Sequence, residues 1–245
     1  MDIDGFLDLA RKRRSIRVLK SDPVPDEWIQ KILEAGRWAM SGANSQPWEY
    51  IVVKDQKIKE EMGKGFMEVK KEADPIERTR VDKFRHPLQS HTYDLPPWTK
   101  APVVIVICGD RRASQASVLF PNFLLSEGST AGSGFLKGMA NTAMMMHLAA
   151  AALGLGSQWM SITRPWEHYL RSILDVPIMI EIHSMVVVGY PDIDPPPGFR
   201  RELKDIVHYE KFDMSKYRKG QEVIDWITNA RADMRKSDVD LYDKK

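Results

Sequence analysis

The chain has 245 residues, which is enough for a sizeable hydrophobic core and for one large domain or two small ones. Its 36 lysines and arginines against 34 aspartates and glutamates leave a net charge of only +2, which argues against a protein that grips a nucleic-acid backbone. No stretch approaches the roughly 18 apolar residues of a membrane span, and MDIDGFLDLARKRR lacks the apolar core of a signal peptide. We therefore expect a soluble, cytoplasmic protein with no membrane or nucleic-acid partner.

The first part of the chain predicts two helices, a loop, a strand and a third helix. Apolar residues at helical spacing predict a helix over 3–13, which runs into the basic stretch RKRRSIR at 11–17. After the break SDPVP, the segment 26–40 has acids in its first turn and one apolar face, so a helix is predicted from Pro25 onward. SGANSQP (41–47) predicts a loop. WEYIVVKD (48–55) predicts a short strand, and Asp55 then caps a polar helix over 56–73.

The middle of the chain, residues 74–132, has little regular pattern apart from one apolar run. Residues 74–100 hold scattered prolines, histidines and aromatics, and residues 110–132 are also irregular. Between them lies PVVIVICGD (102–110), which predicts a strand that is covered on both faces. We interpret residues 74–132 as a lid or insert.

The last part predicts alternating helices and strands. The longest helical pattern starts at Ser133 and stops at Gly154. It is followed by a strand over 157–162, a helix over 165–174, a core strand over 182–191 and the loop DIDPPPG. A helical C-terminal extension is predicted for 215–245. Because helices and strands alternate without a break in composition, we predict one α/β domain over 1–245.

Several kinds of catalytic site are disfavoured by the motifs. GSGFLKG (132–138) resembles a dinucleotide-binding turn, but no strand precedes it and no acid follows about 20 residues later. The six histidines lack metal-ligand spacing, so no metal site is expected. There is no GxSxG motif, and the single Cys108 lies in an apolar strand. The sequence therefore offers no catalytic nucleophile.

The basic stretch and the loop at 41–47 together favour a flavin mononucleotide. Arginine side chains bind phosphate through paired N–H donors, and in an extended segment Ser15 and Arg17 point to the same side. The loop offers short polar side chains and backbone amides that could bind the polar edge of a flat heteroaromatic ring. Taken singly, the stretch could be a solvated helix end and the loop an ordinary turn. Their combination indicates FMN.

Four segments, in order, resemble the successive signatures of the nitroreductase superfamily. They are RRSIR, VPDEWIQKILEAGRWAMSGANSQPWEYIVV, AAAALGLGSQWMS and FRRELKDIV. The resemblance implies an α+β fold of the three-layer α/β type, in which helices flank a mixed central sheet. It also implies an FMN-bound homodimer whose subunits share their domains.

The resemblance also implies a role for each matching residue. Phosphate and ribityl contacts fall on Arg13, Arg14, Ser15 and Arg17. The loop that one subunit lends to its partner's flavin holds Ser41, Gly42, Asn44 and Gln46. The segment facing flavin N5 is Met160 and Ser161. The late basic residue that reaches the phosphate is Arg200, with Arg201 beside it. The long helix at 134–153 matches the central helix of the dimer.

The implied activity is electron transfer from NADH or NADPH through flavin N5 to a small aromatic acceptor, a nitroaromatic or a quinone. This scheme requires no catalytic side chain. A reductive dehalogenase resembling iodotyrosine deiodinase is the alternative, because RRSIR, SGA and the hydroxyl of Ser161 are similar to that branch. The branch's lid has a Glu followed four residues later by a Tyr, and this spacing is absent between residues 60 and 92. A nucleic-acid-binding module built on RKRRSIR is the third hypothesis, and the balanced charge argues against it.

Overall fold

The computed structural model of the protein describes residues 2–81, 94–116, 130–195 and 200–230. The chain divides into two compact units. The sheet unit comprises Met1–Val69 and Tyr93–Asp194, and the tail unit comprises Lys70–Thr92 and Pro195–Lys245. The predicted single domain with a lid stays a prediction.

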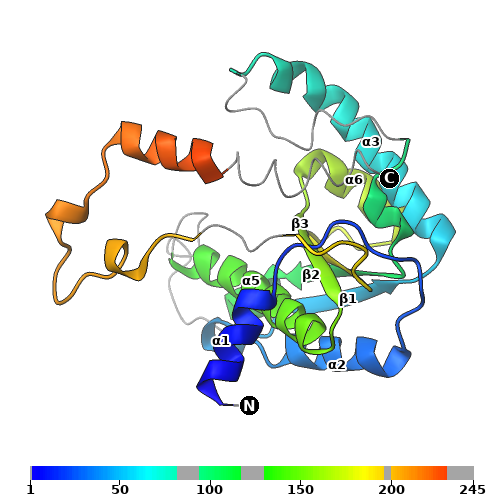
Figure 1. The fold of residues 1–245 in the computed structure, drawn as a ribbon. Helices are drawn as coiled ribbons and strands as arrows, with labels where there is room; N and C mark the ends of the chain where they lie inside the picture. Colours follow the sequence, from blue (N-terminus) through cyan, green and yellow to red (C-terminus); the bar gives the residue numbers. More distant parts are fainter. Residues whose placement is uncertain (1, 82–93, 117–129, 196–199, 231–245) are drawn as a thin grey trace. The chain divides into compact units, whose positions relative to one another are not determined.

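The sheet unit is built on a four-stranded antiparallel sheet with the order β1-β2-β4-β3 (Figure 1). The strands are β1 (Trp48–Val53), β2 (Val103–Asp110), β3 (Gly156–Ser161) and β4 (Ile180–Gly189). A mixed sheet was predicted, but every pairing between these strands is antiparallel. Among the described residues the parallel pairing is an isolated bridge between Ser15 and Ser157.

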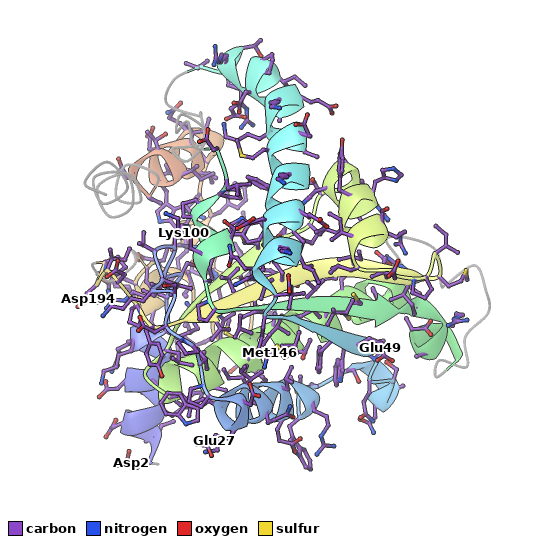
Figure 2. The ribbon with its side chains drawn as sticks, turned by 90° about the vertical axis from the view of Figure 1, so that its right-hand side faces the viewer. Asp2, Glu27, Glu49, Lys100, Met146 and Asp194 are labelled. Atoms are coloured by element: carbon purple, nitrogen blue, oxygen red, sulfur yellow. The ribbon has the colours of Figure 1, made fainter. Side chains whose placement is uncertain are left out.

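Strand β2 is apolar and buried from Val103 to Cys108 because helices cover both faces of the sheet. Alternate side chains of a strand point to opposite faces, so β2 contributes to two separate cores. Val103, Ile105 and Ile107 pack with the helices α2 (Asp26–Arg37) and α5 (Thr130–Ala152). Val104, Val106 and Cys108 pack on the other face with α6 (Arg164–Ile173) and the first part of α3 (Gln56–Arg78). Figure 2 shows these two layers of helices on either side of the strands. This confirms the three-layer α+β fold.

Local signals set several helix ends. Helix α1 (Ile3–Lys12) starts where the side chain of Asp2 accepts a hydrogen bond from the backbone N–H of Gly5 at 2.9 Å. The predicted cap at Asp55 is confirmed, since its carboxylate accepts from the Ile58 N–H at 3.0 Å. Helix α5 ends at Ala152, two residues before Gly154, whose φ of +75° suits glycine, and the Leu155 N–H donates back to the Ala150 carbonyl at 2.9 Å. None of the described helices is long and apolar enough to cross a membrane.

Three stretches without a predicted helix are helical. Helix α3 continues through Pro75 to Arg78, supported by an ion pair between Lys70 and Asp74 at 2.7 Å. Helix α4 spans Arg111–Ala116, and α5 begins at Thr130. The rest of the predicted lid includes 82–93 and 117–129, which lie outside the described residues. In the predicted C-terminal extension, Met214–Lys216 form a 3-10 turn and residues 220–230 a helix.

Candidate functional site

The basic segment leaves α1 as extended chain, the form in which Ser15 and Arg17 were expected to point to the same side, and it runs beside the start of β3. Arg13 ends the helix with extended backbone angles (φ −62°, ψ 119°). The N–H of Ile16 donates to the Ser157 carbonyl at 2.9 Å, and Ser15 is bridged to Ser157. Gly156 permits this approach, because a Cβ atom there would lie 3.0 Å from the Cβ of Ile16. The predicted phosphate contacts thus lie at the start of β3.

A second segment, residues 190–194, bonds to the residues that directly follow the basic segment and to Arg14. The Lys20 N–H donates to the Tyr190 carbonyl at 2.9 Å, and the Asp192 N–H donates to the Val18 carbonyl at 3.1 Å. Two residues later, the carboxylate of Asp194 accepts a hydrogen bond from Arg14 Nη2 at 2.9 Å. The side chain of Asp194 is 92% exposed, so this pair lies at the surface. Arg14 therefore already has an anionic partner within the chain.

A buried histidine lies on α5 under the start of β3. Nδ1 of His147 is 2.6 Å from Oγ of Ser157. Burial, together with the positive charge of Arg13, lowers the pKa of His147 to about 4, so the ring is neutral at pH 7. Its Nε2 is buried without a hydrogen-bond partner among the described residues. In the sequence, His147 was weighed only as a possible metal ligand. The one feature that could have pointed to a buried role is its position as a polar residue on an apolar helix face.

The loop at 41–47 forms a tight turn against α5. Gly42–Asn44 form a 3-10 turn, and the Ser41 hydroxyl accepts a hydrogen bond from the Gln46 N–H at 2.9 Å. Asn44 and Gln46 have φ values of 52° and 44°, in the left-handed region that L residues other than glycine rarely adopt. The side-chain amide of Asn141 fixes the loop by donating to the Met40 carbonyl at 3.1 Å. These hydrogen bonds therefore hold the loop at 41–47 in a defined conformation without a ligand.

Met160 and Ser161 end β3, opposite Met185 and Ser184 of β4. Ser157 and Ser161 share a face of β3, because side chains at even spacing point the same way. Ser157 contacts His147 of α5, so this is the face that α5 covers. Four residues of strand span about 13 Å. The predicted phosphate end and the predicted N5 end thus lie along one face of one edge strand.

The loop and the N5 segment belong to opposite edges of the sheet. The loop leads directly into β1, and Ser161 ends β3, with β2 and β4 between them. Three inter-strand spacings amount to about 14 Å. One chain therefore does not bring these two predicted contacts together. Arg200 and Arg201 belong to the tail unit, where Arg201 Nη2 donates to the Asp205 carbonyl at 2.7 Å; their role stays a prediction.

An antiparallel sheet between two helical layers, with an arginine-rich segment beside the start of its edge strand, defines an α+β architecture. The chain belongs to the nitroreductase family, which it matches over residues 10–190.

Two curated relatives and one solved structure illustrate this membership. A protein of Thermus thermophilus named NADH dehydrogenase is 30% identical over 200 residues, covering 81% of this chain and 92% of the relative. The iodotyrosine deiodinase of Thermotoga neapolitana is 27% identical over 214 residues, covering 84% and 97%. The structure of an FMN-dependent nitroreductase from Clostridium difficile R20291 has a TM-score of 0.61 at 22% identity, covering 84% of this chain and 99% of that one. The last comparison shows a shared fold.

Proposed function

We propose that the chain is an FMN-dependent oxidoreductase that passes electrons from NADH or NADPH to a small nitroaromatic or quinone. The observation that carries this proposal is the position of Ser15 and Ser161 at the two ends of one face of β3. A flavin mononucleotide lying along that edge would have its phosphate beside Arg13 and Arg17 and its ring beside Met160 and Ser161. When bound, the flavin supplies the hydride chemistry.

In this proposal the protein binds and orients. Arg13 and Arg17 donate charge-assisted hydrogen bonds to phosphate, with Ser15 as a further donor. Ser161 presents a hydroxyl and a backbone amide near the reacting end of the ring. This scheme requires no acid or base from a side chain: the hydride carries the electron pair with one proton, and water can supply the second proton that a quinone takes up. Preorganised donors of this kind favour developing negative charge.

We propose that a second copy of the chain completes the site with its 41–47 loop. The separation of that loop from Ser161 across the sheet supports this arrangement. Large apolar side chains are also exposed on α1, on α5 and just before the loop: Ile3, Phe6, Leu7, Leu136, Met144, Trp38 and Met40. Burying exposed apolar side chains favours association, so these residues are candidates for contact with the second copy. Sedimentation of the FMN-loaded protein tests the proposal, and a flavin-loaded monomer would refute it.

A visible spectrum tests the cofactor directly. The purified or FMN-reconstituted protein should show flavin absorbance at about 450 nm that is bleached by NADH or NADPH without oxygen. Absence of bound flavin after reconstitution would overturn the proposed function.

Reductive dehalogenation is a second candidate, supported by the relative named iodotyrosine deiodinase, which aligns over 84% of this chain. Ser161→Ala separates the two candidates, because it removes the hydroxyl and keeps the backbone amide. One-electron chemistry depends more on a hydrogen bond at N5, so dehalogenation should fall roughly five- to hundred-fold. Reduction of a quinone by an electron pair should change little. We favour the two-electron reductase, and equal losses in both reactions would contradict this separation.

A further inference from the structure

A second group of arginines lines a pocket at the end of the sheet where β2 ends and β4 begins. The pocket has a volume of about 530 Å³, within the range of small-ligand sites. Four arginines from two segments line it: Arg111, Arg112, Arg164 and Arg171. Ile178 and Met179, both strongly exposed, add an apolar lip.

Two glutamates link three of these arginines. Arg111 pairs with Glu181 and also lies over the ring of Phe135 at 4.7 Å. Arg171 Nη2 donates to Glu167 at 2.7 Å and to the Ile180 carbonyl at 2.9 Å. These bonds hold Arg111 and Arg171 in the wall of the pocket. Glu181 thus pairs with Arg111, and Glu167 with Arg171.

Arg164 carries the surplus charge of the group. The pocket's four arginines face three carboxylates, because Arg112 also pairs with Asp110 at 2.8 Å. One positive charge therefore remains among these seven side chains. Arg164 lies 3.0 Å from Glu167 and 3.9 Å from Glu181, the two carboxylates that already bind other arginines. Its side chain is 73% exposed, and exposed pairs are weak, so it can turn to a bound anion at little cost.

The pocket lies close to the proposed reaction site. Arg164 follows Ser161 by three residues, and Glu181 lies three residues from Ser184, the partner of Ser161 across the strands. Three residues of strand span about 10 Å. Ser161 and the pocket therefore lie toward the same end of the sheet, and a substrate whose reducible group lies at Ser161 could extend an anionic end toward the arginines. The first turn of α6 adds a weakly positive helix terminus at the same place.

We propose that this pocket binds an anionic group of the substrate, and that Arg164 makes the enzyme prefer organic anions to neutral molecules of the same shape. The inference rests on the proposed function, whose substrate class it narrows. A carboxylate on the electron acceptor and the 2′-phosphate of NADPH share the required chemistry. Arginine suits both, because its planar donors match carboxylate and phosphate oxygens.

Calorimetry with benzoate and benzamide tests the pocket, because the two molecules match in size and differ in charge. The FMN-loaded protein should bind benzoate more tightly. Arg164→Gln should weaken benzoate roughly ten-fold and leave benzamide unchanged, and Arg164→Lys should retain part of the preference. Lys54→Gln is the control: it removes one exposed charge just after β1, at the opposite end of that strand from the pocket.

Steady-state kinetics distinguish the two sources of the anion. If the acceptor carries it, Arg164→Gln lowers kcat/KM for 4-nitrobenzoate relative to nitrobenzene roughly ten-fold and leaves the NADPH-to-NADH ratio unchanged. If NADPH carries it, Arg164→Gln lowers the NADPH-to-NADH ratio of kcat/KM and leaves the ratio of 4-nitrobenzoate to nitrobenzene unchanged. A folded, FMN-loaded Arg164→Gln protein with unchanged ratios and unchanged benzoate affinity would overturn this inference and leave the proposed function standing. A protein that binds no FMN would overturn the proposed function, and benzoate calorimetry would still test the pocket.

Discussion

The two arginine groups of the sheet unit differ in how they are positioned. The first is contiguous in sequence, residues 11–17. It is positioned by the backbone hydrogen bond from Ile16 to Ser157, and the residues that follow it, Val18 and Lys20, bond to the 190–192 segment. The second comes from the end of β2 and from α6, and alternating ion pairs with Glu167 and Glu181 hold it. In both groups, carboxylates of the chain already neutralise part of the positive charge: Asp8 and Asp194 in the first, and Glu167 and Glu181 in the second. The number of arginines in a cluster therefore says little about its capacity to bind an anion.

Removing Glu167 should have the largest effect, because its side chain is only 10% exposed and it binds Arg164 and Arg171. Glu167→Ala leaves the half-buried Arg171 without its carboxylate, so the free energy of unfolding should fall by about 3–5 kcal/mol. Urea denaturation measures the change. Asp8→Ala, which breaks the exposed pair with Arg11, is the control and should cost less than about 1 kcal/mol. Similar losses in both variants would contradict the distinction between the two kinds of ion pair.

The pH dependence of stability tests the packing under the basic segment. The pKa of His147 is about 4 in the folded protein, against 6.5 for an ordinary histidine, so below pH 6.5 the unfolded chain binds a proton that the folded one does not. This contribution is complete above about pH 6.5 and is lost as the pH falls to about 4, a change of about 3 kcal/mol. His147→Gln should flatten the free energy of unfolding over that window. An equally steep dependence in the variant would assign it to other groups.

Arg17→Ala addresses the phosphate role of the first group. Losing its charge-assisted bonds should weaken FMN by about 1.5–3 kcal/mol, roughly ten- to hundred-fold, while the fold persists because Arg17 is not a core residue. Fluorescence titration of FMN measures the affinity. Arg11→Ala is the matched control, since Arg11 is exposed on α1 and bonded to Asp8. If both variants lost FMN affinity equally, the affinity would depend on the net charge of the segment and not on a specific contact of Arg17.

Asp194→Asn should have the smallest effect on FMN affinity, and it should raise the affinity instead of lowering it. The Asp194 carboxylate lies 2.9 Å from Arg14, where it would compete with and repel a nearby phosphate. Because the pair is exposed, removing the charge should raise FMN affinity by less than about 1 kcal/mol, at most roughly five-fold. The same titration measures it. Weaker FMN binding would mean that Asp194 holds Arg14 in position for the ligand.

Most helices and strands followed from local pattern, and the exceptions have local causes. The apolar run of β2, the cap at Asp55 and the stop at Gly154 all behaved as their chemistry predicts. Pro75 was interpreted as the start of a loop, but α3 continues three residues past it, supported by the Lys70–Asp74 pair. Helix α4 was missed because a six-residue helix has too few turns to show a period.

The sequence by itself determined the residues whose chemistry is contiguous. RRSIR places arginines around one serine, and SGANSQP forms a turn, because both depend on neighbours a few positions away. Only the tertiary structure decided which distant groups meet them. Arg14 pairs with Asp194 across 180 residues, and Arg111 with Glu181 across 70. These pairs depend on the order and register of the strands, which bring distant segments together. No local sequence pattern records such contacts, so the sequence alone does not show which arginines are already paired with a carboxylate.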